Sequence, residues 1–117
     1  MDATPPLFVA CLCAEWCGVC REFGSVFQRA ASDFDGRARF AWVDVEDQAD
    51  RLGGIEVDDF PTLLIGRGDT VIFFGAVLPQ APLVARVVEQ ALAGERAALP
   101  VTEALRSLAR QLGADLV

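Results

Sequence analysis

An unbroken apolar run near the start of the chain, Leu7-Phe8-Val9-Ala10-Cys11-Leu12-Cys13, most constrains the fold. Consecutive apolar residues without polar alternation predict a central β-strand covered on both faces, as in a parallel sheet between layers of helices. The run is too short to cross a membrane and has no basic residues before it, so neither a membrane span nor a secretion signal is expected. We therefore expect a cytoplasmic α/β protein.

Apolar periodicity and turn residues define the rest of the architecture. They predict helices over about 17–32, 47–52, 83–92 and from Thr102, and strands over 40–45, 62–65 and 70–74. Gly66 to Asp69 is the expected turn of a hairpin between the last two strands. This order predicts one mixed sheet with helices on both faces, in a single domain over residues 1–117.

The composition removes several kinds of chemistry. The chain has no histidine, lysine or tyrosine, so it lacks the parts for a Ser-His-Asp triad, a Cys-His pair, a histidine metal site or a lysine Schiff base. Seventeen acidic residues against ten arginines give a net charge of -7, so neither nucleic acid nor a membrane surface is an expected partner. The four cysteines, at positions 11, 13, 17 and 20, remain the main candidates for chemistry.

Cys17 and Cys20 lie where the first predicted strand is followed by a helix. Three residues of separation on the first helical turn put both sulfurs on one face, close enough to form a disulfide. Free N–H groups and the positive end of the helix dipole favour a thiolate at Cys17. The second sulfur lies deeper, where it can attack a mixed disulfide. This placement favours a redox-active pair over two inert thiols.

Cys11 and Cys13 are two residues apart in the predicted strand and share the face expected to look toward Cys17 and Cys20. In the simplest interpretation they are small buried apolar side chains. In a second they are auxiliary thiols, with Cys11 exchanging with Cys20. In a third, all four sulfurs hold Zn²⁺ or Cu⁺. Because a rigid strand followed by a helix wraps poorly around a tetrahedral ion, no metal is expected.

The sequence resembles the thioredoxin family in two motifs and one further glycine. These are Ala14-Glu15-Trp16-Cys17-Gly18-Val19-Cys20-Arg21, Phe60-Pro61-Thr62-Leu63 and Gly75. The resemblance covers about residues 7–93 and implies a thioredoxin-like fold, to which residues of about 95–117 add a C-terminal helical extension.

The same resemblance implies roles for these residues. Cys17 would attack a substrate disulfide and Cys20 would resolve the mixed disulfide, giving a reversible Cys17–Cys20 disulfide without any bound cofactor. Pro61 would have a cis peptide bond and lie opposite the cysteines, with the backbone of Phe60 and Thr62 pairing with an extended substrate. Substrate contacts are further implied for Trp16, Gly18, Val19 and Gly75.

The sequence also departs from the family pattern. Cys11 stands where the family usually has a buried carboxylate, and Trp42 stands where a lysine often pairs with that carboxylate. The usual proton acceptor for the resolving thiol is therefore missing. The usual first strand and helix are also expected to be absent. That absence would leave the strand at 40–45 as an exposed edge of a four-stranded sheet, and a candidate dimer surface.

The expected function is that of a protein disulfide reductase acting on protein or small disulfides. Its electrons would come from a reductase or a low-molecular-weight thiol, and the chain is expected to be a monomer or a weak dimer. Residues 44–59 hold seven acids and one arginine, and Asp58, Asp59 and Glu15 are expected to place negative charge near the rim of the site. That charge opposes a thiolate and favours a reducing potential, below about −230 mV.

Two alternatives stay open at this point. One is a redox-inactive thioredoxin-fold interaction or chaperone module, which would show no turnover. The other is a cysteine-rich zinc- or copper-binding protein, which would carry stoichiometric metal.

Overall fold

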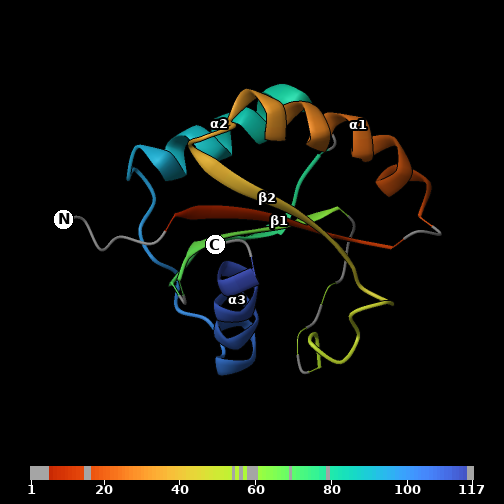
Figure 1. Cartoon of the computed structure of the whole chain (residues 1–117), viewed down its shortest axis with the longest axis vertical. Coiled ribbons are helices and arrows are strands. Elements are labelled where there is room, and N and C mark those ends of the chain that lie inside the picture. Colours follow the sequence, from red (N-terminus) through yellow and green to blue (C-terminus); the bar gives the residue numbers. More distant parts are fainter. Residues whose placement is uncertain are drawn as a thin grey trace.

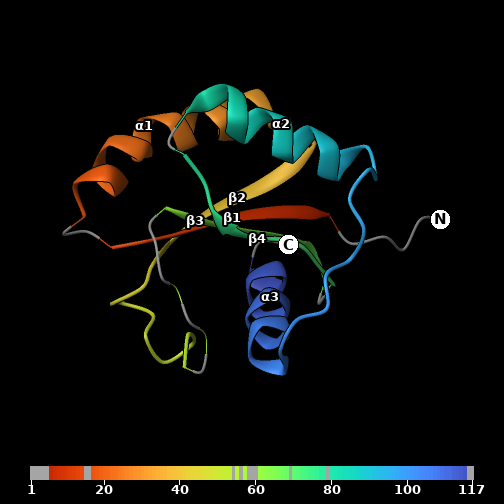
Figure 2. The same cartoon turned by 180° about the vertical axis from the view of Figure 1, so that it is seen from behind.

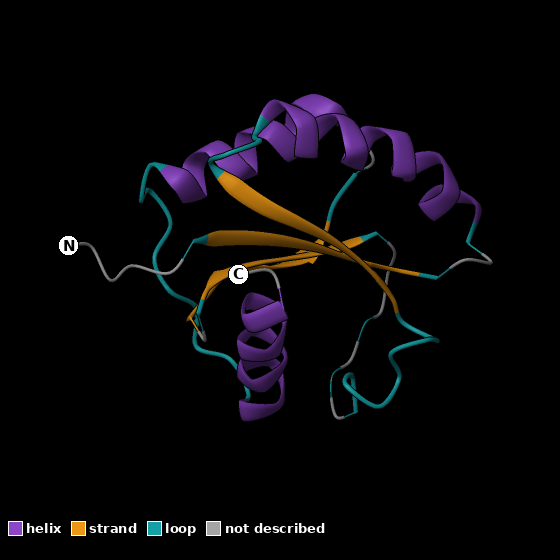
Figure 3. Cartoon of the chain, in the orientation of Figure 1, coloured by secondary structure: helices purple, strands orange, loops and turns teal. Residues whose placement is uncertain are grey.

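The computed structural model describes residues 6–14, 17–53, 55, 57, 61–68, 70–78 and 80–115. Its elements follow one another in an order close to the predicted one. Figure 3 distinguishes the helices, strands and loops by colour. They are β1 (Leu7–Cys13), α1 (Gly18–Asp33), β2 (Ala38–Asp44), β3 (Thr62–Arg67), β4 (Thr70–Ala76), α2 (Ala81–Leu92) and α3 (Glu103–Asp115). Within the described part of the chain, no helix is both long and apolar enough to cross a bilayer.

The four strands form one mixed sheet in the order β2-β1-β3-β4. β1 runs parallel to β2 and antiparallel to β3, and β3 and β4 form the antiparallel hairpin. The predicted mixed sheet is thus confirmed, with β1 in its interior and β2 at one edge.

Helices cover both faces of this sheet. α1 and α2 lie together on one face and α3 lies on the other (Figure 1), as the view from behind also shows (Figure 2). β1 is buried along its whole length because its side chains alternate between these two layers. Leu7, Val9, Cys11 and Cys13 belong to the core under α1 and α2, and Phe8, Ala10 and Leu12 belong to the core over α3. The doubly covered strand expected from the apolar run is therefore confirmed.

The C-terminal helix α3 is an integral layer of the fold. Thr102 caps it as predicted, because the Leu105 N–H donates to Thr102 Oγ1 at 3.2 Å. Leu105, Leu108 and Leu112 are buried against the sheet on the side opposite α1. These contacts keep water from the second face of β1.

The predicted helix over 47–52 is wrong, since the structure has a series of turns at 45–53. Asp44 Oδ1 accepts hydrogen bonds from the backbone N–H groups of Glu46 and Asp47, at 2.9 and 3.1 Å. An aspartate that satisfies nearby N–H groups in this way competes with a helix for the same donors. The apolar residues of this segment are still a correct sign of burial, since Leu52 packs into the core over α3.

The β3–β4 hairpin is confirmed, with a shorter turn than predicted. β3 continues through Gly66 to Arg67, which pairs with Thr70, so the reversal lies between Arg67 and Thr70. Gly68 has a φ of 58°, a conformation that glycine adopts without strain. Gly66 is a strand residue at a register shift, and a Cβ there would lie 2.5 Å from the Thr70 carbonyl oxygen.

Candidate functional site

Cys17 lies at the start of α1, close to the end of β1. It is the N-cap residue of α1, with extended backbone (φ −81°, ψ 120°), and its N–H donates to the Ala14 oxygen at 3.0 Å. This bond holds the start of α1 close to the end of β1. The Cys17 side chain is half-buried, makes no capping hydrogen bond and carries a free thiol. The structure thus provides one thiol within reach of water.

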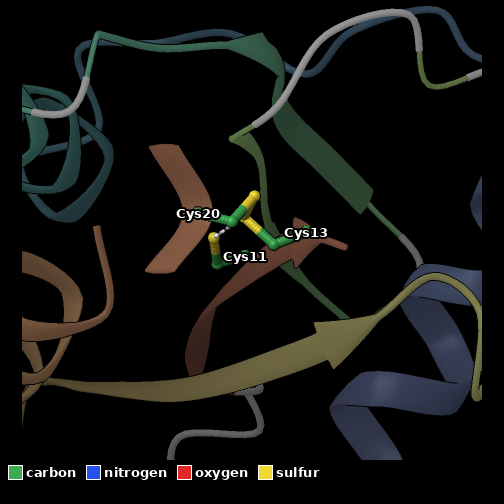
Figure 4. Close-up of a disulfide and its surroundings, with 3 residues drawn as sticks. All are labelled: Cys11, Cys13 and Cys20. Carbon is green, nitrogen blue, oxygen red and sulfur yellow. Dashed lines mark hydrogen bonds between the residues drawn. A yellow bond between two sulfur atoms is a disulfide. The ribbon is translucent and has the colours of Figure 1, made fainter. Parts of the chain in front are cut away.

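Cys20 lies one turn into the same helix on its inward face, and its side chain is buried. Its sulfur forms a disulfide with Cys13, the last residue of β1 (Figure 4). The Cα atoms of Cys13 and Cys20 are 5.8 Å apart, well within the usual range for a disulfide. The expected Cys17–Cys20 bond is therefore not the bond in this structure. The inward face of α1 lies directly over the end of β1, so Cys13 is the partner of Cys20.

Cys11 completes a cluster of three buried sulfurs between β1 and α1. Its Sγ lies 3.6 Å from Cys13 Sγ (Figure 4), and it carries a free thiol. The prediction that Cys11 and Cys13 share the face toward the helix is confirmed. Burial raises the pKa of the Cys11 thiol to about 12, because the apolar surroundings disfavour its charged form.

The residue beside Cys11 on the edge strand is Trp42. The two are register partners on β1 and β2. The Trp42 ring packs edge-on against Phe27 of α1, with centroids 5.7 Å apart. An apolar pair of thiol and indole thus occupies the two positions where the family usually has a carboxylate and a lysine.

Burial of Cys11 predicts a loss of stability in alkali. The unfolded thiol titrates near 9.0 and the folded one near 12, so between these values the unfolded state binds fewer protons. Stability is then full below pH 9 and falls above it by up to about 1.4 kcal/mol per pH unit. The chain has no lysine or tyrosine to obscure this slope. Urea unfolding at pH 8 to 11 in a phosphine reductant, compared with Cys11→Ala, measures it. Equal slopes in the two proteins would contradict the assignment.

Pro61 directly precedes β3, at the end of that strand nearest to the sulfurs of Cys11, Cys13 and Cys20. In the antiparallel register Leu12 pairs with Thr62, so Cys13, which follows Leu12, and Pro61, which precedes Thr62, lie at the same end of the sheet. Pro61 is buried, and its carbonyl oxygen accepts a hydrogen bond from the Val77 N–H at 3.0 Å. Thr62 is buried as the first residue of β3. Pro61 and Thr62 of the second motif are thus brought to the same end of the sheet as the cysteines.

The other predicted site residues lie at different depths. Gly18 and Val19 form the exposed first turn of α1, and Val19 is 41% exposed. Gly75 is a half-buried residue of β4, paired with Leu63. Trp16, expected to contact the substrate, and Phe60, whose backbone is expected to pair with it, lie outside the described residues.

A polar pocket lies beside Cys20, the buried cysteine of α1. It has a volume of about 460 Å³ and lies between the first turns of α1 and the end of β2. Cys20 and Arg21 contribute to one wall, and Asp44 and Asp47 to another. Asp44 and Asp47 therefore bring negative charge to this pocket, whereas the acids predicted at the rim, Glu15, Asp58 and Asp59, lie outside the described residues. In the described part of the chain, no group of three or more His, Cys, Asp or Glu side chains could hold a metal ion.

A free thiol at a helix N-cap and a disulfide behind it, at the end of an interior strand of a mixed sheet, define a disulfide-carrying α/β domain. The family model for thioredoxin matches residues 3–89. The chain belongs to the thioredoxin family.

Relatives and solved structures agree with this assignment. A putative thioredoxin 2 of Streptomyces coelicolor is 37% identical over 71 residues, covering 60% of this chain and 52% of the relative. A thioredoxin of Chlorobaculum thiosulfatiphilum is 34% identical over 59 residues, covering 50% and 55%. The chain thus spans about half the length of these relatives.

Two solved structures share the fold. The germline-specific thioredoxin Deadhead of Drosophila melanogaster superposes with a TM-score of 0.66 and 21% identity, covering 74% of this chain and 81% of that one. Chloroplastic thioredoxin z gives a TM-score of 0.67 and 22% identity, covering 77% and 81%. The thioredoxin-like fold is therefore confirmed.

The residue that sequence reasoning undervalued is Cys13. One of the open interpretations has Cys11 exchanging with Cys20, whereas the bond is formed by Cys13. The available signal was position: Cys13 is the last residue of the apolar run and so the one nearest to the helix start. The hydrogen bond from the Cys17 N–H to the Ala14 oxygen holds the start of α1 close to the end of β1, where Cys13 lies.

Proposed function

We propose that this chain is a thiol–disulfide oxidoreductase that reduces protein or small disulfides, with Cys17 attacking and Cys20 resolving. The observation that carries the proposal is the difference in depth between the two sulfurs. Cys17 is half-buried at the N-cap, and Cys20 is buried one helical turn further on. A thiol that substrate reaches can open a disulfide, and a screened one can then close the cycle without being consumed by solvent reactants.

The reaction consists of two exchanges. The Cys17 thiolate attacks one sulfur of the substrate disulfide, a mixed disulfide forms, and the first substrate thiolate leaves. The Cys20 thiolate then attacks Cys17 Sγ, the mixed disulfide breaks, and the second substrate thiolate leaves. The substrate gains two electrons, and the protein ends with a Cys17–Cys20 disulfide. A reductase or a low-molecular-weight thiol restores the dithiol.

The proton of Cys20 needs a route out of the core. Cys11 does not accept it near neutral pH, because the pKa of about 12 keeps that thiol protonated. The pocket that Cys20 lines with Asp44 and Asp47 supplies a polar wall instead. We assign proton release to this pocket, in place of the buried carboxylate found in the family.

Substrate docking is assigned to the end of β3. The Val77 N–H holds the Pro61 carbonyl, so the backbone that leads into Thr62 is fixed beside the sulfurs. An extended substrate segment can pair with such a backbone as an added strand. Exposed apolar side chains are available at Val19 on α1 and at Leu78 after β4. The acidic 44–59 segment favours substrates that are basic or neutral where they touch this protein.

The four cysteines also suit a reducing compartment such as the cytoplasm.

Trapping of the mixed disulfide tests the assignment of roles. Reduced Cys20→Ser protein should accumulate a covalent complex with insulin, visible on a non-reducing gel and removed by dithiothreitol, because the resolving thiol is gone. The matched control is the double variant Cys17→Ser/Cys20→Ser, which should form none. A redox-inactive module predicts no complex with either protein. An equal yield from both variants would show that another thiol attacks.

A further inference from the structure

We propose that Cys13 is a second partner of Cys20, which takes over the disulfide from Cys17 by internal exchange and leaves Cys17 as a free thiol in the oxidised protein. This inference rests on the proposed function, since it begins from the disulfide that the reduction of a substrate leaves behind.

The position of Cys20 gives its sulfur two partners. Cys17, three residues earlier, is the N-cap of the same helical turn, and Cys13 ends the strand beneath it. The bond observed is the one to Cys13. Rotation about the Cα–Cβ bond of Cys20 between staggered rotamers is the movement that redirects its sulfur from helix to strand.

The exchange is balanced without an external oxidant or reductant. The Cys13 thiol gives up its proton and its sulfur attacks Cys20 Sγ. The Cys13–Cys20 bond forms, the Cys17–Cys20 bond breaks, and the electron pair of the broken bond leaves on Cys17, which takes up the proton. One disulfide and one thiol are present before and after.

Burial gives this exchange a direction. Cys13 is fully buried, with the Cys11 sulfur only 3.6 Å away, and a charge in such surroundings loses its hydration. Cys17 is half-buried, and water can solvate the sulfur that leaves. The isomer with Cys13 bonded therefore places the neutral disulfide in the dry core and the ionisable thiol at the surface.

The exchange from Cys17 to Cys13 changes what the oxidised protein can do. Oxidised protein in the Cys13–Cys20 form retains the attacking thiol but lacks a free resolving thiol. Cys17 can then exchange with a second disulfide and hold it as a mixed disulfide that Cys20 cannot release. While Cys13 is bonded to Cys20, the oxidised protein can therefore capture a substrate through Cys17 but cannot complete its reduction.

Disulfide mapping during turnover tests the exchange. Reduced wild-type protein is mixed with insulin, quenched in acid at successive times, alkylated and digested. Trypsin does not separate the four cysteines, because the first basic residue in the chain is Arg21. A glutamate-specific protease is used instead, since it cuts after Glu15 and Glu22. Cys11 and Cys13 then lie on one peptide, and Cys17 and Cys20 on another. We expect a link within the second peptide first, and later a cross-link between the two peptides with Cys17 alkylated.

The variants assign the cross-link. Cys13→Ala should lose it and keep the Cys17–Cys20 link, whereas the matched control Cys11→Ala should retain it. Wild-type protein that turns over and shows only the Cys17–Cys20 link at all times would overturn the inference, whether or not Cys13→Ala folds. That result leaves the proposed function intact, whereas failure of Cys20→Ser to trap insulin would remove the proposed function itself.

Discussion

Replacing Cys17 with serine is expected to lower the rate of insulin reduction by more than about a hundredfold, because a serine hydroxyl does not ionise near neutral pH and is a far weaker nucleophile than a thiolate. The substitution is small and lies at a half-buried position that makes no side-chain capping bond. Serine is itself a favoured N-cap residue, so the fold should be preserved or slightly stabilised. A large loss of turnover would therefore report chemistry and not unfolding.

The matched control for this measurement is Cys11→Ala. It also removes one thiol, but from the buried face of β1 and from a position that the proposed exchanges do not use. Its turnover should stay close to that of the wild type. Turnover by Cys17→Ser at the control rate would show that the exposed N-cap thiol is not the nucleophile.

Gly66→Ala is expected to cost about 3 kcal/mol of unfolding free energy, at the upper end of what overpacking usually costs. A Cβ at this position would lie 2.5 Å from the Thr70 carbonyl oxygen and 3.1 Å from two ring atoms of Phe8. Thr70 contributes backbone from the paired strand, and Phe8 is buried in the interior strand, so neither neighbour moves aside easily. The β3–β4 hairpin would have to open or shift.

The chain offers a matched glycine for comparison. Gly24 lies inside α1, and a Cβ there would meet nothing within 4 Å. Gly24→Ala should therefore raise stability by about 0.5–1 kcal/mol, through the better helix propensity of alanine. Urea unfolding in a reductant, which removes differences in disulfide state, measures both variants. Equal midpoints for Gly66→Ala and the wild type would contradict the packing around β3.

Much of this fold could be predicted because it follows from local patterns. Seven apolar residues in succession predict the buried strand β1. The helical spacing of apolar residues after Cys17 predicts α1. The turn region at 45–53 could not be predicted in the same way. Its apolar residues repeat at helical spacing, but the Asp44 side chain takes the backbone donors that a helix would need.

The candidate site shows the same division. Both motifs could be recognised from residue types, and the register brings Pro61 to the end of β3 beside Cys13. Which sulfur lies beneath Cys20 depends on how α1 packs over the end of β1, a tertiary feature that spacing alone does not specify. The sequence therefore identified four candidate thiols but not the pair that is bonded.

A redox titration with thiol counting tests the central claim, that this chain cycles between a dithiol and a disulfide as a reductant. The protein is equilibrated in dithiothreitol and glutathione buffers of graded potential, quenched in acid and alkylated, and its free thiols are counted by mass. We predict a single two-electron transition from four free thiols to two, centred below about −230 mV. Four free thiols throughout, or a midpoint near about −120 mV, where strong oxidants lie, would contradict it.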